Sequence, residues 1–170
     1  ITYRNKFKLK NYRNGFLLYE KYSRKDACRI LNWESNEDST MYGYKIKYNT
    51  CPIFVNYHKE GHISRTTLYK DEFIDQSNFQ WYSRSNRKIT SNEISSLINH
   101  ENKLKMPLFI KRNNDEGADF YFMGFVTPKN ETFKETTIEG EKGKKVPIVK
   151  VVFSMNDLVK ENIYNYITKL

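Results

Sequence analysis

The sequence is poor in the residues that mark metal sites, linkers and membrane spans. Its 170 residues include only two cysteines, four prolines and seven glycines. Two cysteines without C-x-x-C spacing, and three histidines without paired spacing, predict no metal site. So few glycines and prolines exclude collagen-like and linker-like chains. No apolar run approaches the roughly 20 residues that cross a bilayer, so we expect a soluble, cytoplasmic domain with no membrane partner.

Aromatic side chains, in contrast, are plentiful. The 13 tyrosines, 11 phenylalanines and two tryptophans make up 15% of the chain. This proportion is incompatible with disorder over most of the chain, and 170 residues are enough to bury a single core. The chain starts at Ile1 rather than methionine, which leads us to expect a fragment of a longer protein.

Positive charge is in excess and unevenly distributed. Lysine and arginine number 29 against 20 acidic residues, which gives a net charge of +9. Residues 1–30 and 76–113 carry the whole excess, because the remaining segments are slightly acidic. If the two basic segments meet in space, they form a patch that can hold phosphates. A solvated surface encoded by an AT-rich genome is the plainer explanation.

Short strands and helices alternate along the chain, which favours a mixed α+β fold. Ser23 and Asp26 have the spacing of a helix-capping box. The predicted elements are helix 24–32, strands 43–48, 52–58, 79–83, 108–111, 120–126 and 146–153, helices beginning at Ser91 and Asp157, and an exposed loop over 128–145. This order suits a small curved sheet or open barrel with helices packed at its edges.

The usual signatures of catalysis are missing. The sequence contains no G-x-S-x-G, H-E-x-x-H or P-loop motif. The run at 140–145, GEKGKK, resembles a phosphate loop only superficially, because it lacks the glycine spacing and a following Ser or Thr. Neither Asp71-Glu72 nor Asp115-Glu116 is followed by the E-x-K strand pattern of a restriction-type nuclease. We therefore expect no catalysis and no cofactor in this chain.

Aromatic residues stand beside polar and basic ones at 41–45, 55–59 and 79–84. Stacking on a nucleobase needs a flat ring, and recognition of its edge needs donors and acceptors beside that ring. Each of the three segments supplies both. For any single residue, a place in the core is the better expectation. The segment around Trp81 is the strongest case, because an unbroken polar and basic run follows it.

Several segments resemble the DUF3427 domain, a family of unknown function. The matching stretches are YSRKDACRILNW at 22–33 and the segments 42–44, 52–59, 69–73, 79–84 and 119–124. They cover nearly the whole chain in the family's order. Members of this family occur at the C-terminus of bacterial proteins that join a phospholipase D-like nuclease to a superfamily 2 helicase.

The resemblance implies a function and a fold. Within this family, an ATP-consuming type IV restriction enzyme cuts DNA that carries 5-methylcytosine or 5-hydroxymethylcytosine. The domain would then recognise the modified base in duplex DNA, with the helicase and nuclease domains of the parent chain as partners. The implied fold is an SRA-like, PUA-type curved β-barrel that flips the base into a pocket. We expect this domain to span 23–170, with 1–22 as a basic N-terminal extension packed on it.

No motif carries pocket residues over from the SRA family, so we select candidates by their chemistry. Tyr57 and Trp81 are the expected stacking pair, with Tyr44 and Tyr82 in reserve. Asn56, Ser83 and Asp71 are candidates for the Watson–Crick edge, because Asp accepts from the cytosine amino group and the others donate or accept. The candidates for phosphate contacts are Arg24, Arg29, Arg84, Arg87 and Lys88.

Two other functions remain open. The domain could be a sequence-blind clamp that helps a helicase grip DNA, or a protein-docking domain whose charge is incidental. Salt dependence of binding distinguishes docking from both DNA-binding functions, because neutralisation of phosphates makes affinity fall steeply with salt. A comparison of methylated with unmodified duplex distinguishes the reader from the clamp.

Overall fold

The computed structural model describes residues 10–41, 43–59, 70–101 and 103–170. The α-helices are α2 (Arg24–Ile30), α4 (Asn92–Ile98) and α5 (Glu161–Thr168). The strands are β1 (Tyr12–Arg13), β2 (Phe16–Leu17), β3 (Lys21–Tyr22), β4 (Ile53–Asn56), β5 (Glu72–Asp75), β6 (Asn78–Tyr82), β7 (Met106–Lys111), β8 (Phe120–Pro128), β9 (Lys134–Glu139) and β10 (Lys145–Met155). Short 3-10 helices lie at Asp38–Thr40, Asn114–Glu116, Asn130–Thr132 and Glu141–Gly143. None of the described helices is long and apolar enough to cross a membrane.

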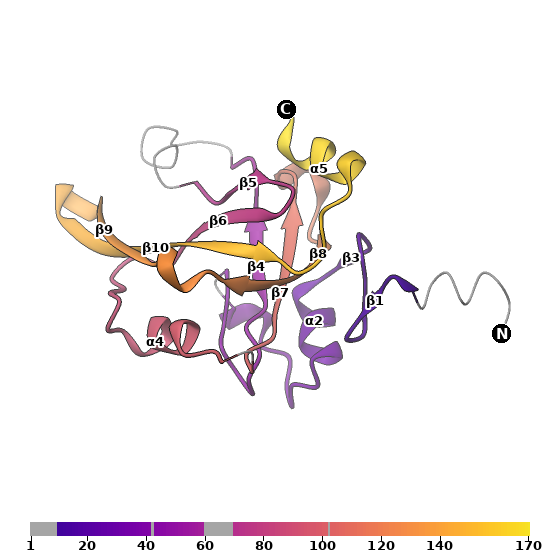
Figure 1. Ribbon diagram of the computed structural model, residues 1–170, viewed down its shortest axis with the longest axis horizontal. Coiled ribbons are helices and arrows are strands. Elements are labelled where there is room, and N and C mark those ends of the chain that lie inside the picture. Colours follow the sequence, from indigo (N-terminus) through magenta and orange to yellow (C-terminus); the bar gives the residue numbers. More distant parts are fainter. Residues whose placement is uncertain (1–9, 42, 60–69, 102) are drawn as a thin grey trace, which may run out of the picture.

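One large sheet organises the molecule (Figure 1). Its strand order is β4-β7-β8-β10-β6-β5, with β3 added to β8 and β9 added to β10. Among the strand pairs that the structure describes in this sheet, β4–β7 is parallel and the others are antiparallel. The mixed α+β class is therefore confirmed. Among the described residues no pairing joins β4 to β5, so the described sheet is open, and the curved β-barrel that the resemblance implies is not shown.

Hydrophobic side chains pack on both faces of this sheet. Strand β4 shows the alternation: Ile53 and Val55 belong to one core, and Phe54 belongs to the other. The first core includes residues of α4 and α5, and the second includes residues of α2 and the N-terminal hairpin. The helices therefore cover opposite faces, and the central strands are almost completely buried, as a two-sided sheet requires.

The N-terminal segment takes part in the fold. Phe16 in β2 is completely buried in the second core and stacks on Phe122 of β8 at 5.1 Å. Arg13 forms an ion pair with Asp157 at 3.0 Å, which ties the β1–β2 hairpin to the turn before α5. We expected residues 1–22 to form an extension packed on the domain. The part of it that the structure describes, from residue 10 onward, contributes the Phe16 side chain to the core. Residues 1–9 lie outside the described residues.

Helix α2 begins where the sequence predicts. The Ser23 hydroxyl accepts a hydrogen bond from the Asp26 amide at 3.0 Å, and the Asp26 carboxylate accepts one from the Ser23 amide at 3.1 Å. This is the capping box, which satisfies two backbone donors that a helix start leaves without partners. The helix ends two residues earlier than expected, and Asn32 adopts a positive φ of 59° just beyond it.

Candidate nucleic-acid interface

A carboxylate and a backbone amide meet where β5 and β6 lie side by side. Asp71 immediately precedes β5, and the amide of Tyr82, the last residue of β6, donates a hydrogen bond of 2.8 Å to its Oδ1. Gln80 supports the same segment, because its Nε2 donates to the Lys70 carbonyl at 3.3 Å. The position of the Asp71 carboxylate is therefore set by the register of this strand pair.

Burial changes the acidity of this carboxylate. Desolvation raises the pKa of Asp71 to about 6, against the opposing effects of the Tyr82 hydrogen bond and the charge of Lys59. The Tyr82 amide occupies Oδ1 of this carboxylate. A desolvated carboxylate is an acceptor suited to the exocyclic amino group of cytosine.

Tyr82 is the aromatic candidate nearest to this carboxylate. Strand β6 alternates, with Phe79 and Trp81 buried in the first core and Gln80 and Tyr82 only partly buried on the other face. The Tyr82 ring is therefore outside the tightly packed interior, on the residue whose amide holds Asp71. Of the four aromatic candidates, Tyr82 is the one that the fold leaves partly exposed.

The structure places the expected stacking pair elsewhere. Trp81 is 2% exposed, stacks on Phe153 at 5.2 Å and meets the edge of Tyr44 at 4.7 Å. Tyr57 is 5% exposed, and its hydroxyl accepts a hydrogen bond from the Phe73 amide at 3.1 Å. Burial raises the pKa of Tyr57 to about 12. Both rings are core residues, which corrects the expectation of a pocket wall.

Tyr44, Arg84 and Arg87 form one network around Glu93. The Tyr44 hydroxyl donates to Glu93 and accepts from the Arg84 amide at 3.0 Å. Both guanidinium groups form ion pairs with Glu93, at 3.4 Å for Arg84 and 3.1 Å for Arg87. The Arg84 guanidinium also lies 4.2 Å from the centre of the Tyr44 ring. These arginines therefore stabilise the junction of β6 and α4. The sequence led us to expect phosphate contacts from them and did not indicate this structural role.

Ser83 and Asn56 also make internal contacts. The buried Ser83 hydroxyl donates to the Arg84 carbonyl at 2.9 Å and accepts from the Val149 amide at 3.0 Å. It therefore joins β6 to β10, a structural use that differs from the expected role at the base edge. Asn56 donates to Asn114, while its own Oδ1 is buried without a partner among the described residues.

The basic candidates fall into two groups. Arg24 lies 5.1 Å from the centre of the Phe120 ring, and Lys111 of the other basic segment lies 5.0 Å from the same ring. Arg29 is exposed and pairs with Asp26 at 3.4 Å. Lys88 is exposed in the loop that joins β6 to α4. This loop is well separated from α2 (Figure 1), so the two basic segments meet only in part.

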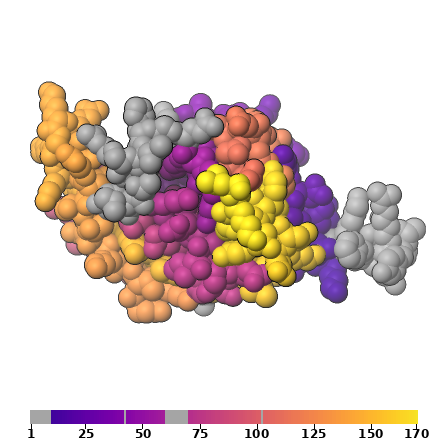
Figure 2. Space-filling model, turned by 90° about the horizontal axis from the view of Figure 1, so that it is seen from above, coloured from indigo at the N-terminus to yellow at the C-terminus, as the bar shows by residue number. Residues whose placement is uncertain are grey.

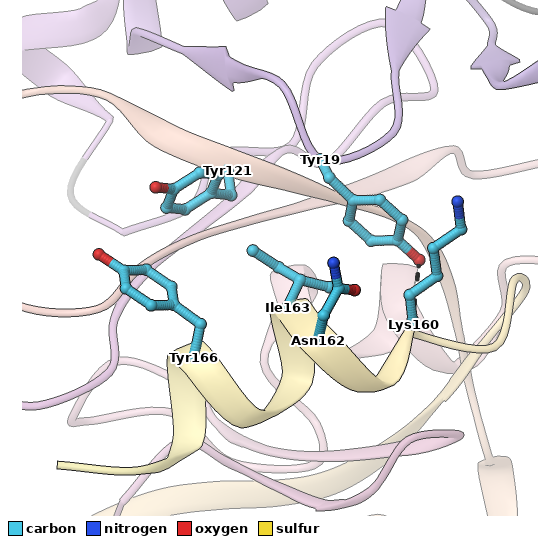
Figure 3. Close-up of a pocket in the computed structure, with 6 residues that line it drawn as sticks. All are labelled: Tyr19, Tyr121, Lys160, Asn162, Ile163 and Tyr166. Atoms are coloured by element: carbon cyan, nitrogen blue, oxygen red, sulfur yellow. Dashed lines mark hydrogen bonds between the residues drawn. The ribbon is translucent and has the colours of Figure 1, made fainter.

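A pocket that the sequence did not indicate lies beside α5 (Figure 3). Its volume is about 350 Å³. It is lined by Tyr19, Tyr121, Lys160, Asn162, Ile163 and Tyr166. These residues come from segments far apart in the chain, so no local motif could have marked them. Among the described residues, no group of three or more His, Cys, Asp or Glu side chains could hold a metal ion.

A comparison with solved structures finds matches at low sequence identity. The "Sulfur binding domain and SRA domain of ScoMcrA complexed with phosphorothioated DNA" is 10% identical, with a TM-score of 0.48, over 91% of this chain and 45% of that one. The "DNA modification-dependent restriction endonuclease AspBHI" is 13% identical, with a TM-score of 0.46, over 69% and 34%. Arabidopsis thaliana SUVH6 is 12% identical, with a TM-score of 0.47, over 85% and 28%.

This chain spans less than half the length of each of those three chains. A comparison with curated proteins finds no significant match. The family model "Domain of unknown function (DUF3427)" matches residues 16–167, nearly the whole chain. The match begins at the buried Phe16 and ends at the buried Ile167. The chain therefore belongs to the DUF3427 family.

Proposed function

We propose that this domain binds duplex DNA and recognises 5-methylcytosine or 5-hydroxymethylcytosine by flipping the base out of the helix. The observation that carries the proposal is the Asp71 carboxylate, held at its Oδ1 by the Tyr82 amide and desolvated enough to raise its pKa to about 6. Its other oxygen, Oδ2, accepts from the cytosine amino group, and the Tyr82 ring stacks on the flipped base. The net charge of +9 supports binding to a polyanion.

The energies of the steps limit the expected selectivity. Flipping a base out of the duplex costs a few kcal/mol, and stacking on one aromatic ring returns about 1–3 kcal/mol. A single methyl group in an apolar gap contributes only about 1–3 kcal/mol. Stacking and the Asp71 hydrogen bond therefore offset the flipping, and the methyl contact decides the outcome. The preference for modified DNA should lie between about tenfold and 200-fold.

We further propose that this domain is the specificity module of an ATP-dependent type IV restriction endonuclease, in a parent chain similar to SauUSI. The support is the resemblance to the family's motifs, and on this proposal the partners are a phospholipase D-like nuclease and a helicase in the same chain. A cytoplasmic location belongs to the same proposal. On this basis the domain alone neither cleaves DNA nor hydrolyses ATP. Nuclease activity that copurified with it and vanished in a point variant would contradict this.

A binding comparison tests the proposal. Fluorescence anisotropy would measure the affinity of the domain for three duplexes of one sequence, with cytosine, 5-methylcytosine or 5-hydroxymethylcytosine at one position. We expect tighter binding of one or both modified duplexes, and loss of that preference in Asp71→Asn. Equal affinities for all three duplexes would favour the sequence-blind clamp. An absence of salt-dependent binding to any duplex would favour the docking domain.

A further inference from the structure

The hairpin formed by β9 and β10 extends beyond the rest of the sheet (Figure 1). Among the described residues, β9 pairs with β10 alone, from Lys145↔Glu139 at the tip to Lys150↔Lys134 at the base. The tip, Glu141–Gly143, and the two lysines that follow it are exposed. The space-filling view shows this hairpin projecting from one end of the molecule (Figure 2). A basic ribbon therefore stands in solvent at this end.

A cleft of about 620 Å³ separates this hairpin from the turn that follows β6. Lys144 and Lys145 line its hairpin side, and Ser85 and Asn86 line the other. Two contacts next to the cleft hold its walls together. The Arg87 amide donates to the Pro147 carbonyl at 3.3 Å, and the Ile89 amide donates to the Glu135 carboxylate at 3.0 Å. The cleft is therefore part of the folded structure.

The lining has the chemistry of a site for a sugar–phosphate strand. Two lysines can neutralise phosphates, and the Ser85 hydroxyl and Asn86 amide can donate hydrogen bonds to phosphate oxygens. Ile138, Val146 and Pro147 supply an apolar surface on which deoxyribose can rest. Glu141 also lines the cleft, so the three charged side chains of the lining sum to +1. Lys88 and Lys142 are exposed in the adjoining turns and add positive charge.

We propose that this cleft grips the backbone of a DNA duplex, independently of whether the DNA is modified. The proposal rests on the proposed function for the identity of its ligand, and it concerns a cleft whose lining includes neither Asp71 nor Tyr82. A two-stranded β-ribbon fits the major groove of B-DNA. The hairpin thus follows the duplex while Lys144 and Lys145 contact consecutive phosphates. Such contacts add affinity and set the orientation of the protein, but they carry no information on the base.

The test compares two double variants of equal charge. Lys144→Gln/Lys145→Gln removes the two lysines of the cleft. Lys103→Gln/Lys105→Gln removes two exposed lysines from the segment between α4 and β7, well away from the hairpin (Figure 1). The affinity of each variant and of the wild type would be measured for a methylated and an unmodified duplex across a series of salt concentrations. Circular dichroism would confirm that each variant is folded.

We expect the cleft variant to lose affinity for both duplexes by the same factor. The slope of log K against log salt should become shallower by about 1.8, because each phosphate contact contributes about 0.9 to it. The control variant should keep the wild-type slope. An unchanged slope in the cleft variant, or an equal change in the control, would overturn the proposal.

The two proposals fail in different ways. A wild-type domain without preference for modified DNA would contradict the proposed function, while a changed slope in the cleft variant would still support the cleft. A preference that persists together with an unchanged slope would contradict the cleft alone. A wild type that binds neither duplex, even at low salt, would overturn both.

Discussion

The backbone amide of Tyr82 donates a 2.8 Å hydrogen bond to Oδ1 of Asp71, eleven residues earlier in the chain. Because the donor is a backbone group at the end of a strand, its position does not depend on any rotamer. The strand pair therefore holds this carboxylate in place. Its desolvation has an energetic cost, which appears as the raised pKa of Asp71.

This cost predicts a pH dependence of stability. Ionisation of Asp71 shifts from its ordinary pKa of 3.8 in the unfolded chain to about 6 in the fold. The folded state thus holds the proton more tightly, so the contribution of Asp71 to stability is lost as pH rises from about 4 to 6. The change is at most about 3 kcal/mol, at about 1.4 kcal/mol per pKa unit.

A comparison of the wild type with Asp71→Asn tests this pH dependence, because asparagine keeps an acceptor for the Tyr82 amide and cannot ionise. Urea unfolding of both proteins between pH 4 and 7.5 should show the variant gaining stability relative to the wild type as the pH rises. Parallel pH profiles would show that Asp71 is not desolvated in solution.

Trp81→Ala should mainly reduce stability, whereas Tyr82→Ala should mainly change DNA binding. Loss of the buried Trp81 ring removes packing against Phe153 and Tyr44, which should cost about 3–5 kcal/mol of stability. Tyr82→Ala should cost much less and should abolish the preference for modified DNA. Thermal melting and the two DNA affinities, measured together, check both outcomes. If Tyr82→Ala keeps the preference, another ring must stack on the base.

Glu93→Gln should weaken the junction between β6 and α4. The variant keeps hydrogen-bonding capacity toward Tyr44 but removes the charge that pairs with Arg84 and Arg87. Partly buried charged hydrogen bonds contribute about 1.5–3 kcal/mol, and each kcal/mol corresponds to about 2–4 °C in the melting temperature of a domain of this size. DNA affinity at low salt should rise, because two arginines lose their carboxylate partner. Weaker DNA binding by a folded variant would contradict this prediction.

Ser23→Ala should destabilise the protein by about 1 kcal/mol, because the start of α2 loses the hydroxyl that accepts from the Asp26 amide. Urea unfolding measures this difference. Ser39→Ala is a suitable control, since Ser39 lies in an exposed 3-10 turn without a buried residue. A loss of the same size in the control would show that the cap is not the cause.

The sequence predicted the helices and strands best where a local signal was strong. The capping box at Ser23 predicted α2, and the strands expected at 108–111 and 120–126 correspond to β7 and β8, which pair with each other. The expected strand at 43–48 is wrong. Tyr48 and Asn49 adopt positive φ, so this segment forms only isolated bridges. The polar segment 128–145, expected to be an exposed loop, contains β9, which pairs with β10 along its whole length.

The residues of the candidate site were harder to predict than the helices and strands. A tryptophan beside a basic run is compatible with a stacking residue and with a core residue, and only the alternation of β6 in three dimensions distinguishes the two. Asp71 was among the candidates, but its hydrogen bond to Tyr82 depends on the register of β5 against β6. The pairing of Arg84 and Arg87 with Glu93 likewise depends on how α4 docks.

The hydrogen bond from the Phe73 amide to the Tyr57 hydroxyl has a consequence for the two ends of the sheet. Tyr57 directly follows β4, and Phe73 lies in β5, and these are the two strands at the ends of the strand order. No backbone pairing joins them among the described residues, so a buried side chain makes the connection. His58, next to Tyr57, is fixed in addition by the Ile167 carbonyl at 2.8 Å. The core, and not strand pairing, therefore holds the two edges of the sheet at a fixed separation.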